Sequence, residues 1–460
     1  MLAALATAVA SSRPDFTETV LMFTSLPGLA QSIERLIDDT PIIDPHTHIH
    51  CDRPSATDLT ALFGYHWVQT ELIAVGMPKE DLDPALPTDE RIRRMIPYLK
   101  RMRNTAMSWC VYRILWDLYE FAEPEVTEAN YRDLLDRVEA KGKDPEWPAH
   151  VLRDRCNIQT FVTSLGNRGE ASSSVAPDAL FMLDAHYLFC PGVATDLDPF
   201  FTGRTRKLDY FEALSQAFGS HPGSSGELSR AVQGWLDRTV TGPVRFTNTF
   251  IPIEQRFRRP DPATIDAILA RIGTAKDQTE ADVDALVDAV TWAILEWHHE
   301  RRKAVQIAVG AEYFICDGKS IPRFQPNWTS EMARTFHEFG NARFDIMMAS
   351  DVLSQEVAVL ARQFPNVYTS GYWWHTFFPS LIERHFALRS QVVPMTKFCA
   401  YLSDSYSVEW AYGKLQVIKR AIASALAHQV ESGFAREEDL PALLQQILHD
   451  SPRDLYDLQR

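Results

Sequence analysis

Residues 41–50 read PIIDPHTHIH, an apolar run that ends in an aspartate and then three histidines at every second position. Side chains alternate between the two faces of a β-strand, so His46, His48 and His50 would point to the same side. Two imidazoles at this spacing can converge on one cation, and imidazole is the commonest metal ligand in proteins. The alternative is a polar strand end whose histidines face solvent. This stretch therefore predicts a strand that ends at a candidate metal site.

Further apolar runs of strand length follow along the chain, at 157–164, 244–250, 304–310, 343–350, 366–371 and 397–403. Stretches with helical periodicity lie between them, such as residues 281–303 and 354–364. Strands that alternate with helices form mainly parallel sheets. Because the strands continue into the C-terminal third, they favour a closed (β/α)8 barrel of the TIM type over a short open sheet. The missing strand or two is expected between residues 178 and 200.

Residues 55–150 interrupt this alternation, because they hold several helical segments and no clear strand. We expect them to form a helical insertion after the first strand, packed near the mouth of the active site. The expected organisation is an N-terminal helical segment at 1–40, the barrel at 41–430 and C-terminal helices at 431–460 that pack on the barrel.

The composition is that of an ordinary globular protein, with 45% hydrophobic and 23% charged residues. A formal net charge of -15 argues against nucleic acid or an anionic membrane surface as the main partner. The six cysteines show no CxxC spacing, which is typical of a reduced, cytoplasmic protein. Residues 1–12 are small and apolar but lack the basic start of a secretory signal, so a frayed or helical end is expected and a signal peptide is the alternative.

A carboxylate would complete a divalent metal site beside the first-strand histidines. Functional residues in a parallel barrel sit at the C-terminal ends of the strands, and His46 and His48 fall at such an end. Asp404 follows the last expected strand, which neighbours the first strand when a barrel closes. Asp404 could instead cap the helix expected after it. We expect His46, His48 and Asp404 to be metal ligands, with His50 further out.

Three longer stretches resemble a known family: DPHTHIH (44–50), NVYTSGYWWHTFFPSLIERHFA (366–387) and YLSDSYSVEWAYGKLQVIKRAIASAL (401–426). They are similar to the uronate isomerase (glucuronate isomerase-like) branch of the amidohydrolase superfamily. The resemblance implies a distorted (β/α)8 barrel with one divalent ion, zinc or else manganese, on His46, His48 and Asp404. It also implies aldose–ketose isomerisation of a hexuronate, such as D-glucuronate or D-galacturonate, to the 2-keto sugar acid.

The chain departs from the family pattern at two positions near this site. Tyr406 stands where the family has an arginine after the last strand, and Ala308 stands where the fifth-strand segment often has a histidine. Two other functions therefore remain open. One is a mononuclear metal-dependent hydrolase or decarboxylase that acts on a different small acid, and the other is a non-catalytic sugar-binding barrel.

Several residues near the expected strand ends are candidates for catalysis or sugar binding. Asp404 is a candidate base, and Tyr406 and His375 are candidate acid–base groups. Trp373 and Trp374 could form a flat platform for a sugar ring, although core packing would explain them equally well.

Arg384 and Arg389, on the helix expected after the tryptophans, are the candidates to clamp a substrate carboxylate, because the planar guanidinium matches it bidentately. An ordinary place on the helix surface is the alternative for both arginines. The expected partner is a small sugar acid or related carboxylate, with no nucleic acid and no membrane, and a homo-oligomer is expected.

Overall fold

The computed structural model describes residues 26–169, 173–185, 188, 210–251, 257–275, 278–313, 320–323 and 325–459. The expectations for the apolar start of the chain lie outside the described residues. The described part begins with helix α2 (Leu26–Asp39), which contacts the long helix α17 (Val408–Glu431).

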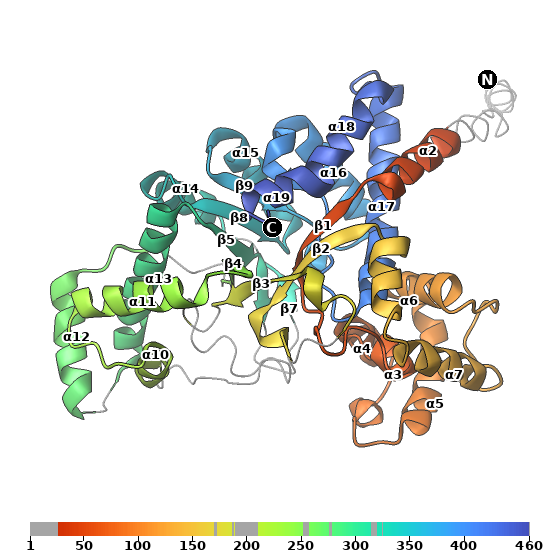
Figure 1. Ribbon diagram of the computed structural model, residues 1–460, viewed down its shortest axis with the longest axis horizontal. Helices are drawn as coiled ribbons and strands as arrows, with labels where there is room; N and C mark the ends of the chain where they lie inside the picture. Colours follow the sequence, from red (N-terminus) through yellow and green to blue (C-terminus); the bar gives the residue numbers. More distant parts are fainter. Residues whose placement is uncertain are drawn as a thin grey trace, which may run out of the picture.

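Eight parallel strands form one sheet in the order β1-β2-β3-β4-β5-β8-β9-β10 (Figure 1). Their bounds are β1 (Ile42–Thr47), β2 (Ile158–Ser164), β3 (Ala179–Asp184), β4 (Val244–Phe250), β5 (Ala304–Val309), β8 (Arg343–Met348), β9 (Val367–Ser370) and β10 (Phe398–Cys399). The missing strand is therefore β3. The predicted α/β fold with a distorted (β/α)8 barrel is confirmed.

The distortion lies where the last strand meets the first. Strand β10 has two residues instead of the seven that the apolar run at 397–403 predicts, and no ladder joins β10 to β1 within the described residues. The chain after β10 still runs beside β1. The backbone N–H of Asp404 donates to His46 at 2.9 Å, and the backbone N–H of His48 donates to Ser405 at 2.7 Å. These two bonds close the barrel at the C-terminal end of β1.

Residues 55–150 form the expected helical region after β1, seen in orange and brown at one side of Figure 1. Its helices are α3 (Leu59–Phe63), α4 (His66–Ala74), α5 (Thr88–Leu99), α6 (Ala106–Leu118), α7 (Tyr131–Gly142) and α8 (Trp147–Ala149). Helices α5 and α6 are separated by a 3-10 turn (Lys100–Met102). The break follows Pro97, and Thr105 starts the second helix because its side chain accepts the N–H of Ser108.

A buried carboxylate fastens this helical region to the rest of the protein. Glu409, in the first turn of α17, is 0% exposed. Its Oε2 accepts the backbone N–H of Ala56 at 3.0 Å. Its Oε1 accepts the hydroxyl of Tyr119 at 3.1 Å and the indole N–H of Trp147 at 3.0 Å. Three points of the helical region are therefore held by one side chain of α17.

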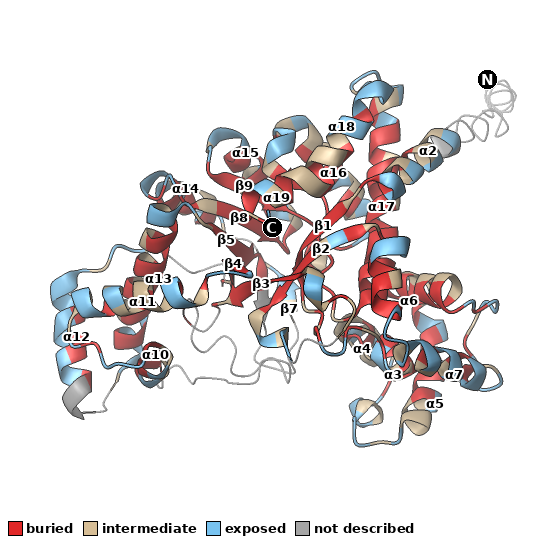
Figure 2. Ribbon diagram, in the orientation of Figure 1, coloured by how far each residue is buried: buried red, intermediate tan, exposed pale blue. Residues whose placement is uncertain are grey.

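The remaining helices lie around the sheet, and Figure 2 shows that they bury one side while the strands are buried on both. They are α10 (Tyr210–Phe218), α11 (Ser225–Thr239), α12 (Pro262–Ala275), α13 (Glu280–Arg301), α14 (Trp328–Glu338), α15 (Ser354–Gln363) and α16 (Pro379–Val392). A small antiparallel pair, β6 (Ala311–Tyr313) and β7 (Ser320–Pro322), follows β5 and was not expected from the sequence.

The C-terminal helices expected at 431–460 are short. The stretch consists of α18 (Leu440–Gln445), a π-helical turn (Gln446–Asp450) and α19 (Ser451–Leu455). Leu455, Tyr456 and Leu458 pack in one cluster with residues near the starts of the strands, among them Ile43 of β1 and Ala304 of β5. The end of the chain therefore closes the side of the barrel opposite to the strand ends that carry the histidines.

Two expectations from composition can be compared with the described residues. Within this part of the chain no helix is long and apolar enough to cross a bilayer. Four of the six cysteines are described, and all are buried and unpaired: Cys51, Cys110, Cys156 and Cys399.

Candidate metal centre

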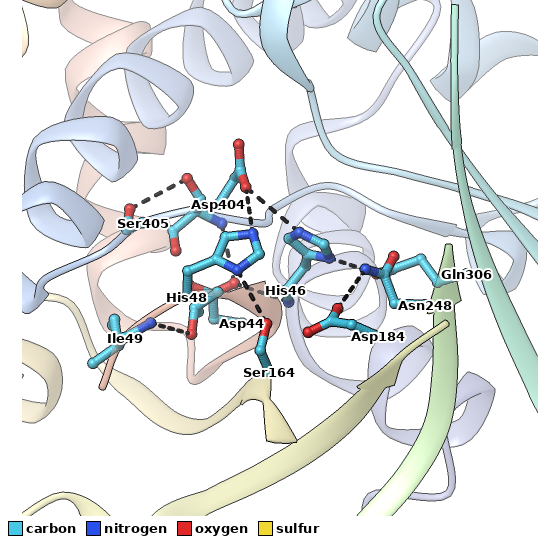
Figure 3. A network of polar contacts seen from close by, with 12 residues as sticks. Asp44, His46, His48, Ile49, Ser164, Asp184, Asn248, Gln306, Asp404 and Ser405 are labelled. Atoms are coloured by element: carbon cyan, nitrogen blue, oxygen red, sulfur yellow. Dashed lines mark hydrogen bonds and ion pairs between the residues drawn. The ribbon is translucent and has the colours of Figure 1, made fainter. Parts of the chain in front are cut away.

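The structure brings together His46 of β1, His48 just after its end and the aspartate that follows β10 (Figure 3). Nε2 of His46 lies 3.5 Å and Nε2 of His48 lies 3.2 Å from Oδ1 of Asp404. One ligand atom from each residue lies within 4.8 Å of the other two, and this is the triad among the described residues that could hold a metal ion. The predicted set of metal ligands is therefore compact enough to surround one cation.

Backbone geometry aims Asp404 at the histidines. Its φ of +49° lies in the left-handed region, which costs a residue other than glycine about 1–3 kcal/mol. Its carbonyl accepts the ammonium of Lys414 at 3.1 Å and the hydroxyl of Tyr65 at 3.3 Å. These bonds, together with the backbone bond to His46, hold the strained conformation that turns the carboxylate into the barrel.

The charges around Asp404 favour the form that binds a metal. Burial alone would raise the pKa of Asp404, but the nearby charge of Lys414 and the hydrogen bonds from His46 and His48 bring the pKa well below its usual range. Burial acts to lower the pKa of His46, yet its pairing with Asp404 raises the pKa overall. A proton and a cation would therefore compete for this imidazole.

A hydrogen bond behind each imidazole orients its ring. Nδ1 of His46 lies 2.6 Å from Oε1 of Gln306 on β5, and Nδ1 of His48 lies 3.1 Å from Oγ of Ser164 on β2. An amide oxygen can only accept, so Nδ1 of His46 carries a proton and Nε2 is the nitrogen that faces Asp404 and can bind an ion. Two imidazoles and one carboxylate are a usual set for a catalytic divalent ion, with further positions left open for substrate or water.

Three aromatic residues form one wall beside this triad. Tyr406 stacks on His48 with ring centroids 5.2 Å apart, and it contacts the rings of Tyr65 and His66 at 5.8 Å and 5.5 Å. Nδ1 of His66 is buried and has no hydrogen-bond partner among the described residues. Burial lowers the pKa of His66 to about 3, so its imidazole is neutral at pH 7. The sequence analysis missed Tyr65 and His66, which come from the helical region.

Comparison with known proteins finds relatives that cover more than nine tenths of this chain. No family model matches the sequence. A uronate isomerase from Thermotoga petrophila is 26% identical over 91% of this chain and 95% of its own length. A uronate isomerase from Corynebacterium efficiens is 20% identical over 94% of this chain and 96% of its own. This chain is similar to uronate isomerases over more than nine tenths of its length.

Solved structures agree with this relationship at the level of the fold. The crystal structure of glucuronate isomerase from Caulobacter crescentus superposes with a TM-score of 0.79 and 16% identity, covering 95% of each chain. That of uronate isomerase from Thermotoga maritima gives a TM-score of 0.77 and 16% identity, covering 93% of this chain and 97% of that one.

The candidate sugar platform lies at the rim of the barrel. Trp373 and Trp374 stack with centroids 4.6 Å apart, and Trp67 of α4 meets Trp374 edge-on at 5.7 Å. His375 contacts Trp67 at 5.4 Å, and its Nε2 lies 3.1 Å from Oγ of Ser320. Burial lowers the pKa of His375 to about 4. The platform and acid–base roles of these residues stay predictions.

The two candidate arginines lie on α16, and their partners come from the segments before this helix. Arg384 is 60% exposed and forms an ion pair with Asp351. Arg389 is buried, donates from Nη1 to the carbonyl of Gly371 at 2.7 Å and lies over the ring of Tyr372. Nε and Nη2 of Arg389 are buried without a hydrogen-bond partner in the described part of the chain. The proposed role of both arginines in binding a carboxylate stays a prediction.

Proposed function

We propose that this chain is a metal-dependent isomerase that interconverts the aldose and ketose forms of a hexuronate, with D-glucuronate or D-galacturonate as the aldose. The observation that carries the proposal is the convergence of His46, His48 and Asp404 at the mouth of a barrel that aligns over its whole length with uronate isomerases. Proteins with this name cover more than nine tenths of the chain, so the proposal concerns the complete barrel.

The proposed metal is one divalent ion, zinc first and manganese second. Imidazole nitrogens and a carboxylate oxygen suit both ions. When bound, such an ion polarises a sugar carbonyl and the neighbouring hydroxyl, which acidifies the proton on C2. Asp404 contributes a carboxylate that its surroundings keep ionised, and His46 and His48 contribute imidazoles whose Nδ1 atoms have partners of their own.

The proton moved between C2 and C1 needs a base that faces the substrate. Asp404 is the first choice, because its second oxygen lies 4.0 Å from Lys414 and its carboxylate is ionised. Tyr406 and His66 border the same space, and the neutral imidazole of His66 can accept a hydrogen bond from a sugar hydroxyl. A general base works best when it lies within hydrogen-bond reach of its proton. His375, which contacts Ser320 at the rim, is placed further out in this proposal.

Aromatic rings would hold the carbon face of the sugar. Trp67 and Trp374 supply flat apolar surface on one side, where the buried Trp373 stacks on Trp374 and supports it, and Tyr406 supplies it on the side of the triad. Rings of this kind pack well on the C–H face of a pyranose or an extended sugar chain.

The test combines metal content with formation of the ketose. Wild-type protein, purified without chelator, is expected to hold about one equivalent of zinc or manganese, and His46→Ala is expected to hold little. His299→Ala is the matched control, because that histidine lies on α13 and contacts Asn341. With D-glucuronate or D-galacturonate in D2O, the wild type and the control should form the ketose, with deuterium at C1 wherever the base exchanges its proton with solvent. Metal without ketose formation from either hexuronate would refute the isomerase and direct a screen to lactones and aromatic acids.

A further inference from the structure

Behind His46, a line of buried polar groups crosses the barrel and reaches the C-terminal stretch. Gln306 accepts from Nδ1 of His46 at 2.6 Å and donates from Nε2 to the hydroxyl of Tyr456 at 2.6 Å. The same amide nitrogen lies 3.2 Å from Oδ2 of Asp345 on β8, and the Tyr456 hydroxyl makes a short hydrogen bond to that oxygen. Asp345 and Gln306 are 0% exposed, and Tyr456 is 1% exposed.

When Asp345 is ionised, the directions of these bonds leave one arrangement for the amide of Gln306. An ionised carboxylate only accepts, and Asp345 receives the hydroxyl of Ser370 at 2.8 Å on its other oxygen. The NH2 group of Gln306 then faces Asp345 and Tyr456, and its carbonyl oxygen faces His46. That oxygen requires a proton on Nδ1 of His46, so Nε2 is the nitrogen that faces Asp404 and is left for an ion.

Tyr456 is held firmly enough to fix this arrangement. Its ring stacks on Phe246 of β4 with centroids 4.1 Å apart. The next residue, Asp457, forms an ion pair with Arg343 at 2.6 Å, and Arg343 also donates to the carbonyl of Asp454 at 2.7 Å. Ion pairs and packing thus anchor the chain on both sides of the tyrosine.

We propose that Tyr456 is a positioning residue for the metal centre, acting through Asp345 and Gln306 to fix the tautomer and orientation of His46. The C-terminal stretch is then a part of the metal site, although it lies at the opposite end of the barrel. The proposal rests on the proposed binding of a divalent ion by His46. Partners that orient a ligating histidine typically change metal affinity 10- to 100-fold when they are lost.

The test measures the affinity of metal-free protein for Zn²⁺ by competition with a chromogenic chelator. Tyr456→Phe removes only the hydroxyl and is expected to bind zinc about 10- to 100-fold more weakly than the wild type. Ser370→Ala is the matched control, because it also removes one hydroxyl from Asp345 but leaves the contact of Tyr456 with Gln306 intact. The control is expected to stay within about threefold of the wild type.

A second readout is independent of metal. In histidine-labelled protein, the ¹⁵N shifts of His46 should report the Nδ1–H tautomer in the wild type and a mixture in Tyr456→Phe. Gln306→Met should weaken zinc binding as much as Tyr456→Phe does, and the double variant should bind no more weakly than Gln306→Met alone. If Tyr456→Phe does not fold, Gln306→Met alone still tests whether the amide that joins Tyr456 to His46 controls zinc binding, and an unchanged affinity would overturn the proposal.

Three results separate this inference from the proposed function. Wild-type protein that binds no zinc would refute the metal site itself. A wild type that binds zinc, with Tyr456→Phe or Gln306→Met within about threefold of it, would overturn the positioning role alone. Equal losses in Tyr456→Phe and Ser370→Ala would also overturn it, because general damage around Asp345 would then explain the effect.

Discussion

Replacing Glu409 by glutamine should loosen the helical region at residues 55–150 from the barrel. The change keeps the size of the side chain but removes its charge and turns one oxygen into a donor. The amide oxygen can still accept from Tyr119 and Trp147, whereas the new NH2 group must face the backbone N–H of Ala56. Two donors then meet in a place that is closed to water.

The size of the effect follows from these three bonds. A buried donor without a partner costs about 1–3 kcal/mol, and a bond to a charged acceptor is about 1 kcal/mol stronger than one to a neutral acceptor. After relaxation we expect about 3 kcal/mol less free energy to open the helical region, because one bond is lost and two are weakened. Each 1.4 kcal/mol is a factor of ten in an equilibrium constant, so the open form becomes about 100-fold more populated.

Limited proteolysis measures that population directly, because cleavage follows the open fraction when reclosing is fast. Cuts within residues 55–150 should appear about 100-fold faster in Glu409→Gln than in the wild type. Glu383→Gln is the matched control, since Glu383 accepts one hydroxyl, from Ser424, and is 39% exposed. Cleavage of Glu409→Gln within about threefold of the control would refute the reasoning that one carboxylate fastens this region.

Three further predictions concern pH, sugar binding and the ion. Burial lowers the pKa of His298 to about 3 from an unperturbed 6.5. Below pH 6.5 the unfolded chain therefore binds a proton that the folded chain does not. The free energy of unfolding should fall as the pH drops toward 3, by up to about 1.4 kcal/mol per pH unit. His298→Gln can keep the contact to Thr247. In urea titrations, this variant should lose less unfolding free energy between pH 7.5 and 5.5 than the wild type loses. An equal loss in both proteins would contradict the role of His298 in the pH dependence. Trp374→Ala should raise KM for the hexuronate about tenfold with kcat little changed, whereas Trp116→Ala on α6 should alter neither; an unchanged KM would remove Trp374 from the sugar platform. Zinc at 100 times its Kd should stabilise the wild type by about 2.7 kcal/mol in thermal unfolding, and Asp404→Asn should lose most of that gain; equal stabilisation of both would exclude Asp404 as a ligand.

The sequence was most informative where apolar runs coincide with strands and polar residues stand at their ends. Seven runs marked seven strands, and the chemistry of His46, His48 and Asp404 could be joined because the first and last strands of a barrel are neighbours. Strand β10 is shorter than its run because the chain leaves the ladder to bring Asp404 into its left-handed conformation. The hydrophobicity of the run does not indicate where the strand ends.

Other parts of the site could not be derived from periodicity. Gln306 is a polar residue in the apolar run 304–310. A buried amide in such a strand indicates that it has hydrogen-bond partners, but the sequence does not identify them. Its partners, Asp345 and Tyr456, are distant in sequence. Tyr65, His66 and Trp67 reach the mouth only through the packing of the helical region. The break after Pro97 is different, because proline inside a helical pattern ends or bends a helix, and the sequence alone could have indicated it.

The closure of the barrel between β1 and the chain after β10 has a consequence for the order of events during synthesis. The two imidazoles leave the ribosome early, but their carboxylate partner follows hundreds of residues later and needs the last strand to dock. A nascent chain can therefore display His46 and His48 without forming the complete triad. In the proposed metal centre, ion binding then follows the docking of Asp404, and a chain that stalls or misfolds earlier lacks the complete triad.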